Sequence, residues 1–236
     1  MSLELQGVSQ VVDGQLHIAP TDLVLEKGTM NVLLGPTSSG KTSLMRLMAG
    51  LDKPSTGRIL SSGKDVTNQR VQLRNVAMVY QEFINYPGMT VFDNIASPLR
   101  LKGQPKADID RTVRTTAEML KLTSILHRRP LELSGGQQQR VAIARALMQD
   151  PRIILADEPI ASLDPMNAQV AMQSLRDIHE QDGRMVIANL HTLDTARRYC
   201  DRVIGMRGGK IVFDGTPEQL TTGVARERTH FLGRSG

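Results

Sequence analysis

The 236-residue sequence has no tryptophan, a single cysteine and only 3% aromatic residues. The lone Cys200 excludes a disulfide framework and a cysteine cluster for zinc. No run of 18 apolar residues is present, so no segment is predicted to span a bilayer. No Lys or Arg precedes Lys27, which argues against a secretory signal. We expect a cytoplasmic chain unless a partner holds it at a membrane.

The charge is basic, with a formal net value of +5 and a pI of about 9.6. A basic balance is compatible with nucleic-acid binding, but no basic stretch is interleaved with aromatic residues that would stack on bases. We interpret the excess as solvated surface together with a preference for polyphosphate, and predict no nucleic-acid partner. A chain of this length that is 40% hydrophobic predicts one compact domain.

Apolar runs of strand length alternate with helix-length segments in most of the chain, a pattern that predicts a parallel sheet and the α/β class. Helices are predicted over 42–49, 107–122 and 166–179 from the spacing of apolar residues. Gly208–Gly209 predicts a hairpin turn. The strand-like runs are Met30–Leu34, Val76–Tyr80, Ile153–Ala156, Met185–Leu190 and Val203–Met206.

The first motif that carries chemistry is a glycine-containing loop between the strand Met30–Leu34 and the following helix. It fits the phosphate-binding loop pattern, whose backbone N–H groups and helix N-terminus wrap phosphates. Lys41 is predicted to meet the β and γ phosphates, and the Thr42 hydroxyl to ligate Mg²⁺. The residues predicted to bind nucleotide here are Gly35, Pro36, Thr37, Ser38, Ser39, Gly40, Lys41, Thr42 and Ser43.

A second motif is the apolar strand Ile153–Ala156, which ends in the adjacent carboxylates Asp157 and Glu158. Asp157 is predicted to hold the magnesium shell, and Glu158 to polarise the attacking water as a general base. By itself this pattern also suits a solvated strand end.

The third motif is Leu133-Ser134-Gly135-Gly136-Gln137, followed by a helix-like segment. Ser134 can cap that helix, and the glycines let an anion approach its N-terminus. In the order phosphate loop, LSGGQ and acidic strand, the chain resembles the ATP-binding cassette (ABC) family from about residue 3 to about residue 220. The resemblance implies a P-loop NTPase with a RecA-like core, an antiparallel β portion and a helical subdomain.

What the family does implies further roles. Gln81 matches the family's glutamine that touches Mg²⁺ and senses the membrane partner. His191 matches the switch histidine that contacts the γ phosphate. Asp164 lies in a segment that matches the loop coupling the two active sites. The expected cofactors are ATP and Mg²⁺. Each ATP is expected between the phosphate loop of one subunit and Ser134, Gly135, Gly136 and Gln137 of the other, in a homodimer or heterodimer.

The same resemblance implies an importer ATPase at the cytoplasmic face of the inner membrane. It would bind integral-membrane permease subunits directly and a solute-binding protein indirectly. The implied domain is 1–236, with core residues 1–92 and 151–222, a helical subdomain at 93–150 and a tail at 223–236. The other histidines, His17, His127, His179 and His230, are interpreted as surface residues.

Two positions depart from the family pattern. The position where members stack adenine on an aromatic residue is Val12, and residues 8–20 contain no Phe, Tyr or Trp. Because stacking on an aromatic side chain is worth about 1–3 kcal/mol in nucleic-acid proteins, this predicts weaker ATP binding or aliphatic packing of adenine. Ser38 stands where the family commonly has glycine, so its Cβ is expected to restrict the loop.

The two halves resemble different subfamilies, namely glycerol and carbohydrate importer ATPases over 1–133 and phosphonate importer ATPases over 134–220. Either a natural subfamily mixes these features, or the chain is an engineered chimera. Two further alternatives stay open: a nucleic-acid-linked ABC ATPase, which would need a coiled-coil insertion, zinc modules or tandem cassettes, and a cassette that binds ATP without driving transport.

Overall fold

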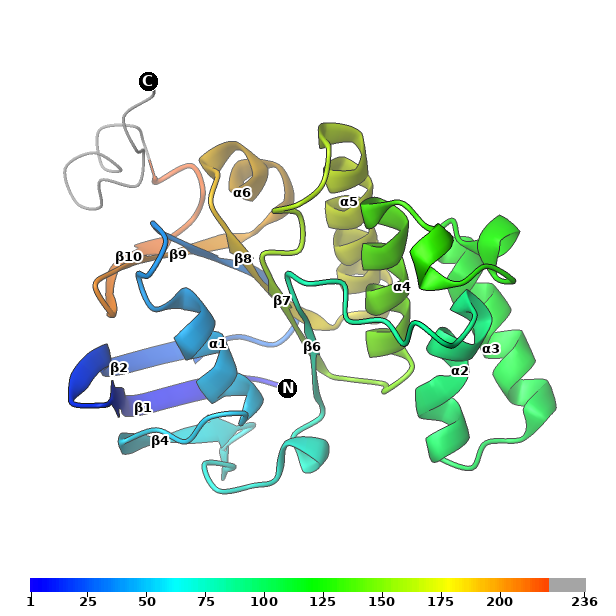
Figure 1. Cartoon of the computed structure of the whole chain (residues 1–236). Coiled ribbons are helices and arrows are strands. Elements are labelled where there is room, and N and C mark those ends of the chain that lie inside the picture. The colour runs from blue at the N-terminus through cyan, green and yellow to red at the C-terminus, as the bar shows by residue number, and fades with distance from the viewer. Residues whose placement is uncertain (221–236) are drawn as a thin grey trace.

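The protein is described here from a computed structural model, which places residues 1–220; the predicted tail at 223–236 lies outside the described residues. Two sheets and a group of helices form the molecule, with helix α1 between the sheets and the helical group at the opposite side (Figure 1). No helix of the described part is long and apolar enough to cross a membrane.

The larger sheet has six strands in the order β10-β9-β3-β8-β7-β6. Its five strands from β9 to β6 are parallel, and β10 pairs antiparallel with β9. Strands β3, β7 and β8 are buried along their whole length, as expected for a parallel sheet covered on both faces. The strands are β3 Met30–Leu34, β6 Val76–Val79, β7 Ile153–Asp157, β8 Met185–Leu190, β9 Arg202–Arg207 and β10 Lys210–Gly215.

The smaller sheet is antiparallel, in the order β2-β1-β4-β5. Helix α1 (Lys41–Ala49) buries Leu44, Met45, Leu47 and Met48 in a core shared with both sheets. This core fixes the start of α1, and with it the preceding loop, above the carboxyl ends of β3, β7 and β8. The strands are β1 Leu3–Val12, β2 Gln15–Leu25, β4 Thr56–Ser61 and β5 Lys64–Asp65.

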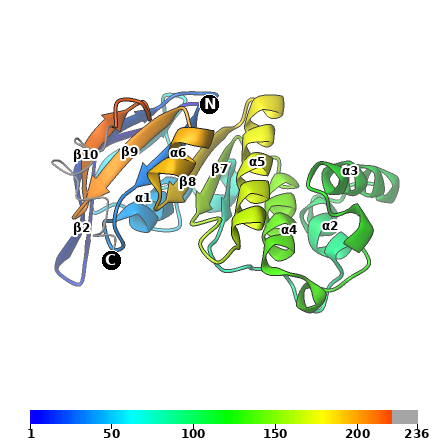
Figure 2. The same cartoon turned by 90° about the horizontal axis from the view of Figure 1, so that it is seen from above.

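A second core lies on the other face of the six-stranded sheet and continues into the helical group, which stands beside α5 in both views (Figure 2). Helix α4 contacts α2, α5 and β6, so it connects this group to the sheet. The division at residues 93–150 stays a prediction. The helices are α2 Val91–Leu101, α3 Lys106–Met119, α4 Gly135–Leu147, α5 Pro165–Asp182 and α6 Leu193–Tyr199, with 3₁₀ turns at Val71–Leu73, Thr123–Ile125 and Pro130–Glu132.

The predicted strands and helices are present; Met30–Leu34 and Met185–Leu190 have the predicted ends, and the others have shifted ends. The helix expected over 107–122 ends at Met119, because Lys121 takes a left-handed backbone conformation with φ of 55°. The hairpin turn at Gly208–Gly209 is confirmed between β9 and β10. The surface interpretation of His179 is wrong: its side chain is buried in α5, and Nδ1 lies 2.8 Å from the Arg184 carbonyl oxygen. His230 lies outside the described residues.

Candidate functional site

The phosphate-loop pattern occupies the turn from β3 into α1. Gly40 precedes the helix with φ of 100°, and no acidic side chain lies in the first turn of α1, so its N-terminus keeps its positive field. Ser38 has φ of 63°, the left-handed region that favours glycine. The structure therefore agrees with the expectation that a Cβ at residue 38 restricts the loop.

Lys41 is buried, with 4% of its surface exposed, and it holds the loop closed. Its Nζ donates hydrogen bonds of 2.8 Å to the carbonyl oxygens of Gly35 and Pro36. Burial lowers the Lys41 pKa, and the nearby carboxylates Glu158 and Asp157 oppose that shift. The loop thus presents one desolvated ammonium group close to two acidic side chains.

Thr42 and Asp157 bring the first two motifs together. The Thr42 hydroxyl donates to Asp157 Oδ1 over 3.0 Å, and Asn189 Nδ2 donates to the same oxygen over 2.7 Å. Asp157 is buried at the end of β7, and Asn189 is completely buried near the end of β8. A hydroxyl oxygen beside a carboxylate is the donor set that Mg²⁺ takes in phosphate sites, so these two residues fit the ion.

Glu158 and His191 form the second polar pair at this sheet edge. His191 Nε2 lies 2.8 Å from Glu158 Oε1, and the two residues directly follow β8 and β7. Glu158 adopts φ of 48°, an uncommon conformation for a non-glycine residue that often marks a functional site. The geometry suits a carboxylate held in position to accept a proton.

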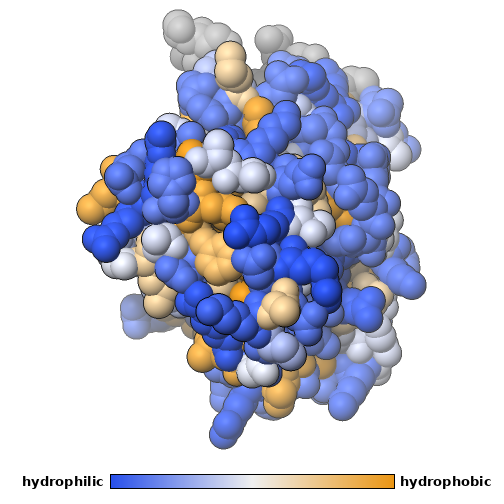
Figure 3. Space-filling view, turned by 90° about the vertical axis from the view of Figure 1, so that its right-hand side faces the viewer, coloured by the Kyte–Doolittle hydropathy of each residue, from blue (hydrophilic) through white to orange (hydrophobic). Residues whose placement is uncertain are grey.

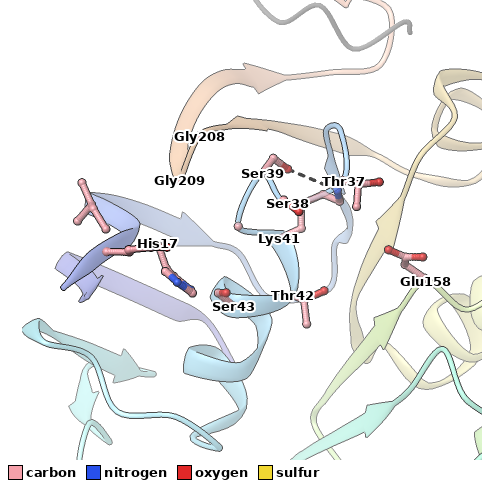
Figure 4. A pocket seen from close by; sticks show the side chains of 13 residues that line it. His17, Thr37, Ser38, Ser39, Lys41, Thr42, Ser43, Glu158, Gly208 and Gly209 are labelled. Carbon is pink, nitrogen blue, oxygen red and sulfur yellow. Dashed lines mark hydrogen bonds between the residues drawn. The ribbon is translucent and has the colours of Figure 1, made fainter. Parts of the chain in front are cut away.

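A cleft of about 560 Å³ opens along the phosphate loop and the start of α1 (Figure 4). Its lining includes part of the predicted set, which stays a prediction, and adds residues from β2 and the β9–β10 turn. Val12 does not line it, and His17, interpreted from the sequence as a surface residue, does. The lining residues are Gln15, Leu16, His17, Thr37, Ser38, Ser39, Gly40, Lys41, Thr42, Ser43, Glu158, Gly208 and Gly209.

The LSGGQ segment lies at the start of α4, outside this cleft. Ser134 caps the helix: its Oγ accepts from Gln137 N over 3.3 Å, while Gln137 Oε1 accepts from Ser134 N over 3.0 Å. This reciprocal capping box satisfies two backbone donors and fixes the entry to α4. No acidic side chain lies in the first turn. No carboxylate in this turn competes for the helix start, so an anion could bind there, but not one held in this chain's own cleft.

Asn167 is a site residue that the sequence did not reveal. Its Nδ2 donates to Asp164 Oδ2 over 2.6 Å, and its Oδ1 accepts from Arg140 of α4 over 3.3 Å. A Cβ on Gly136 would overlap the Asn167 side chain. Asp164 is thus connected through Asn167 to Arg140 of α4 within one chain. The hydrogen bonds that the Asn167 side chain and backbone N–H donate to Asp164 lower the pKa of that carboxyl.

Gln81 is exposed just after β6 and does not line the cleft, so the single chain does not bring it to the other predicted catalytic residues. Asn189 was also missed, although an amide inside the apolar strand Met185–Leu190 is a signal that could have found it. The cleft residues from β2 had no such signal, because backbone contacts through Gly209, which is distant in sequence, bring them to the loop.

Comparison with known proteins gives one consistent picture. The family model for ABC transporters matches residues 18–161, more than half of the chain. The phosphonates import ATP-binding protein PhnC 2 of Roseobacter denitrificans is 54% identical over 217 residues, covering 86% of this chain and 80% of that protein. The corresponding protein of Ruegeria pomeroyi is 53% identical over 241 residues, covering 95% of this chain and 87% of its own.

Solved structures with the same fold include a dimeric post-hydrolysis state of the ATP-binding cassette MJ0796 bound to ADP and Pi. It has a TM-score of 0.82 at 28% identity and covers 91% of this chain and 98% of its own. The structure of cbiO1 from Clostridium perfringens, part of a cbiONQ transporter complex, has a TM-score of 0.86 at 27% identity, covering 92% and 89%. Both structures match the arrangement of sheets and helices described above.

Proposed function

The chain belongs to the ABC transporter family, and we propose that it is the ATP-hydrolysing subunit of a bacterial phosphonate importer. The observation that carries the ATPase part is the meeting of Thr42, at the end of the phosphate loop, with Asp157, at the end of the acidic strand, over 3.0 Å. That contact supports the proposal because it joins the loop predicted to bind phosphate to the pair predicted to bind magnesium, and Glu158 lies at the same sheet edge.

The choice of phosphonate rests on the relatives. Proteins named for phosphonate import align at 53–54% identity over 86% and 95% of the chain, so each alignment includes most of residues 1–133. They give no support to a glycerol or carbohydrate assignment for the first half, or to a chimera joined near residue 134. Nor do the comparisons support a nucleic-acid-linked ATPase.

Binding of the nucleotide follows from the loop geometry. Backbone N–H groups of the loop and the N-terminus of α1 would hold the phosphates, and Lys41 would exchange its loop carbonyl partners for phosphate oxygens. Thr42 and Asp157 would hold Mg²⁺, with Gln81 approaching as the cassette closes. When bound, the ion neutralises charge on the β and γ phosphates.

Hydrolysis then needs an oriented water. Glu158 would accept a proton from it while the water oxygen bonds to the γ phosphorus and the bond from that phosphorus to the bridging oxygen breaks, leaving ADP and phosphate. His191, 2.8 Å from Glu158, would hold that carboxylate and reach the γ phosphate. The buried Lys41 ammonium would offset the charge that develops.

A second cassette completes the site in this proposal. The capped helix start at Ser134–Gln137 does not line its own cleft, so it would be available to the γ phosphate held by a partner copy. Asp164, tied through Asn167 to the same helix, would transmit closure from one site to the other. ATP would therefore hold the dimer together, and hydrolysis would release it.

The membrane subunit would dock beside the helical group. There, hydrophobic side chains gather within a largely hydrophilic face (Figure 3). A groove of about 520 Å³ between β6, α2 and α4 is lined by Tyr86, Pro98, Leu101 and Arg145, among others, and no carboxylate of the described residues lines it. The guanidinium carbon of Arg145 lies 4.8 Å from the centroid of the Tyr86 ring. The buried Nη1 of Arg145 has no hydrogen-bond partner within the described residues. The groove thus suits a segment that supplies apolar contacts and an acceptor, and it would keep the chain at the cytoplasmic membrane face.

Co-purification and transport test the proposal together. The chain is purified with its membrane subunits, and ATP hydrolysis is measured in proteoliposomes with the solute-binding protein and either an alkylphosphonate, glycerol or a disaccharide. We expect stimulation by the phosphonate alone and its loss in Lys41→Ala. Stimulation by glycerol or sugar would overturn the substrate assignment, and the absence of Mg²⁺-dependent hydrolysis would overturn the ATPase assignment.

A further inference from the structure

The backbone of His17, the third residue of β2, lies close to the backbone of the phosphate loop. Gly209 N donates to the Ser39 carbonyl over 3.0 Å, and Ala19 N donates to the Gly209 carbonyl over 2.9 Å. A Cβ on Gly209 would overlap the His17 carbonyl oxygen, and one on Gly40 would lie 3.1 Å from it. Three segments therefore meet with no side chain between them, which fixes residue 17 beside the loop.

This backbone contact directs the His17 side chain into the cleft. Figure 4 shows its imidazole turned toward the start of α1, where Ser43 lies. The loop and the helix N-terminus occupy the phosphate end of the cleft. A triphosphate held there would extend its nucleoside toward Gln15, Leu16 and His17, the residues of β2 that line the cleft.

Among the residues 1–220 that the structure describes, the cleft lining contains no Phe, Tyr or Trp, and the imidazole of His17 is its one ring. Leu16 beside it is 55% exposed and offers an aliphatic surface only. Val12 pairs with Gln15 across the β1–β2 turn and does not line the cleft. The cleft thus contains a flat side chain on which a base can stack. That side chain is His17, five residues after Val12, the position that the family pattern indicated.

We propose that the imidazole of His17 is the stacking surface for the nucleobase of bound ATP. The inference rests on the proposed ATPase function and adds a base-binding residue to it. Stacking uses the π face that every base has, and it contributes in proportion to the area of the ring. The small imidazole ring gives a modest gain, at the low end of the range measured for aromatic side chains.

The test separates base contact from phosphate contact. Binding of ATP and of inorganic tripolyphosphate is measured by calorimetry for the wild-type chain, His17→Ala and His17→Phe. We expect His17→Ala to weaken ATP binding by about 5- to 20-fold and to leave tripolyphosphate binding unchanged, because only ATP has a base. His17→Phe is expected to bind ATP at least as tightly as the wild type.

Matched controls locate the effect. His127→Ala, at an exposed histidine outside the cleft, should leave both affinities unchanged. Equal losses for ATP and tripolyphosphate in His17→Ala, a Phe variant as weak as the Ala variant, or a loss in Val12→Ala in place of His17→Ala would each overturn the proposal. If the wild-type chain bound neither ligand, the proposed ATPase function itself would fail.

Discussion

Nε2 of His191 lies 2.8 Å from Oε1 of Glu158, and this short contact joins the ends of two neighbouring parallel strands. Parallel strands end at the same sheet edge, so a residue that follows β7 meets one that follows β8 although the two are 33 positions apart in sequence. The pair therefore depends on strand register, and it positions the carboxylate proposed as the general base.

Glu158→Gln removes the proton acceptor and keeps the side-chain shape. We expect ATP hydrolysis to fall by about 10²- to 10⁴-fold, the range of general-base contributions, with ATP binding retained. Phosphate release gives the rate, and size-exclusion chromatography with ATP shows whether a dimer accumulates. Glu118→Gln, at an exposed residue of α3, is the matched control and should keep the wild-type rate. Normal turnover in Glu158→Gln would refute the assigned role.

Asp157→Asn and Thr42→Val test the magnesium pair. Each removes one partner of the 3.0 Å contact, so the concentration of Mg²⁺ needed for half-maximal hydrolysis should rise by about 10-fold or more, as when a ligand-shell partner is lost. A Mg²⁺ titration of ATPase activity measures it. Asp177→Asn, far from the cleft on α5, controls for charge. An unchanged Mg²⁺ requirement in both variants would remove these residues from the metal site.

Gly136 and Gly135 provide a neighbouring pair with different surroundings. A methyl group at residue 136 would overlap Asn167, whereas at residue 135 it would lie 3.2 Å from the ring edge of Phe83. We expect Gly136→Ala to lower the free energy of unfolding by about 1–3 kcal/mol and Gly135→Ala by less, since overpacking costs most against a hydrogen-bonded side chain. Urea denaturation measures both.

The double variant Gly136→Ala with Asn167→Ala assigns the clash. Removing the Asn167 side chain should recover part of the loss caused by Gly136→Ala, giving a non-additive cycle of at least about 0.5 kcal/mol. Additive losses would show that the two residues do not interact. Asn167→Ala by itself should also weaken ATP-driven dimerisation in the Glu158→Gln background, because it removes the hydrogen bonds that connect Asp164 to Arg140 of α4.

Burial raises the pKa of the Cys200 thiol to about 12. An unfolded thiol titrates near about 8.5, so between these values the unfolded chain binds fewer protons, and the free energy of unfolding falls as pH rises, by up to about 1.4 kcal/mol per pH unit. Urea denaturation of the wild type and Cys200→Ala at pH 8 and pH 10 isolates this term. An identical pH dependence in the two proteins would contradict it.

Much of the site was predictable because its signals are local. The phosphate loop, the acidic strand end and the capped LSGGQ segment each combine a few adjacent residue types with a backbone shape that those residues favour. Their order along the chain then indicated the family. The helix and strand positions followed from apolar periodicity, with errors at the ends, where a single left-handed residue such as Lys121 stops a helix.

The sequence by itself determined the phosphate loop, the two adjacent carboxylates at the end of β7 and the order of the motifs, because each is written in adjacent residues. Only the tertiary structure decided that Asn189 supports Asp157, that Asn167 ties Asp164 to α4, and that His17 rather than Val12 lines the cleft. These contacts join residues from different elements. Strand register and the close approach of glycine backbones set them, and neither leaves a local pattern in the chain.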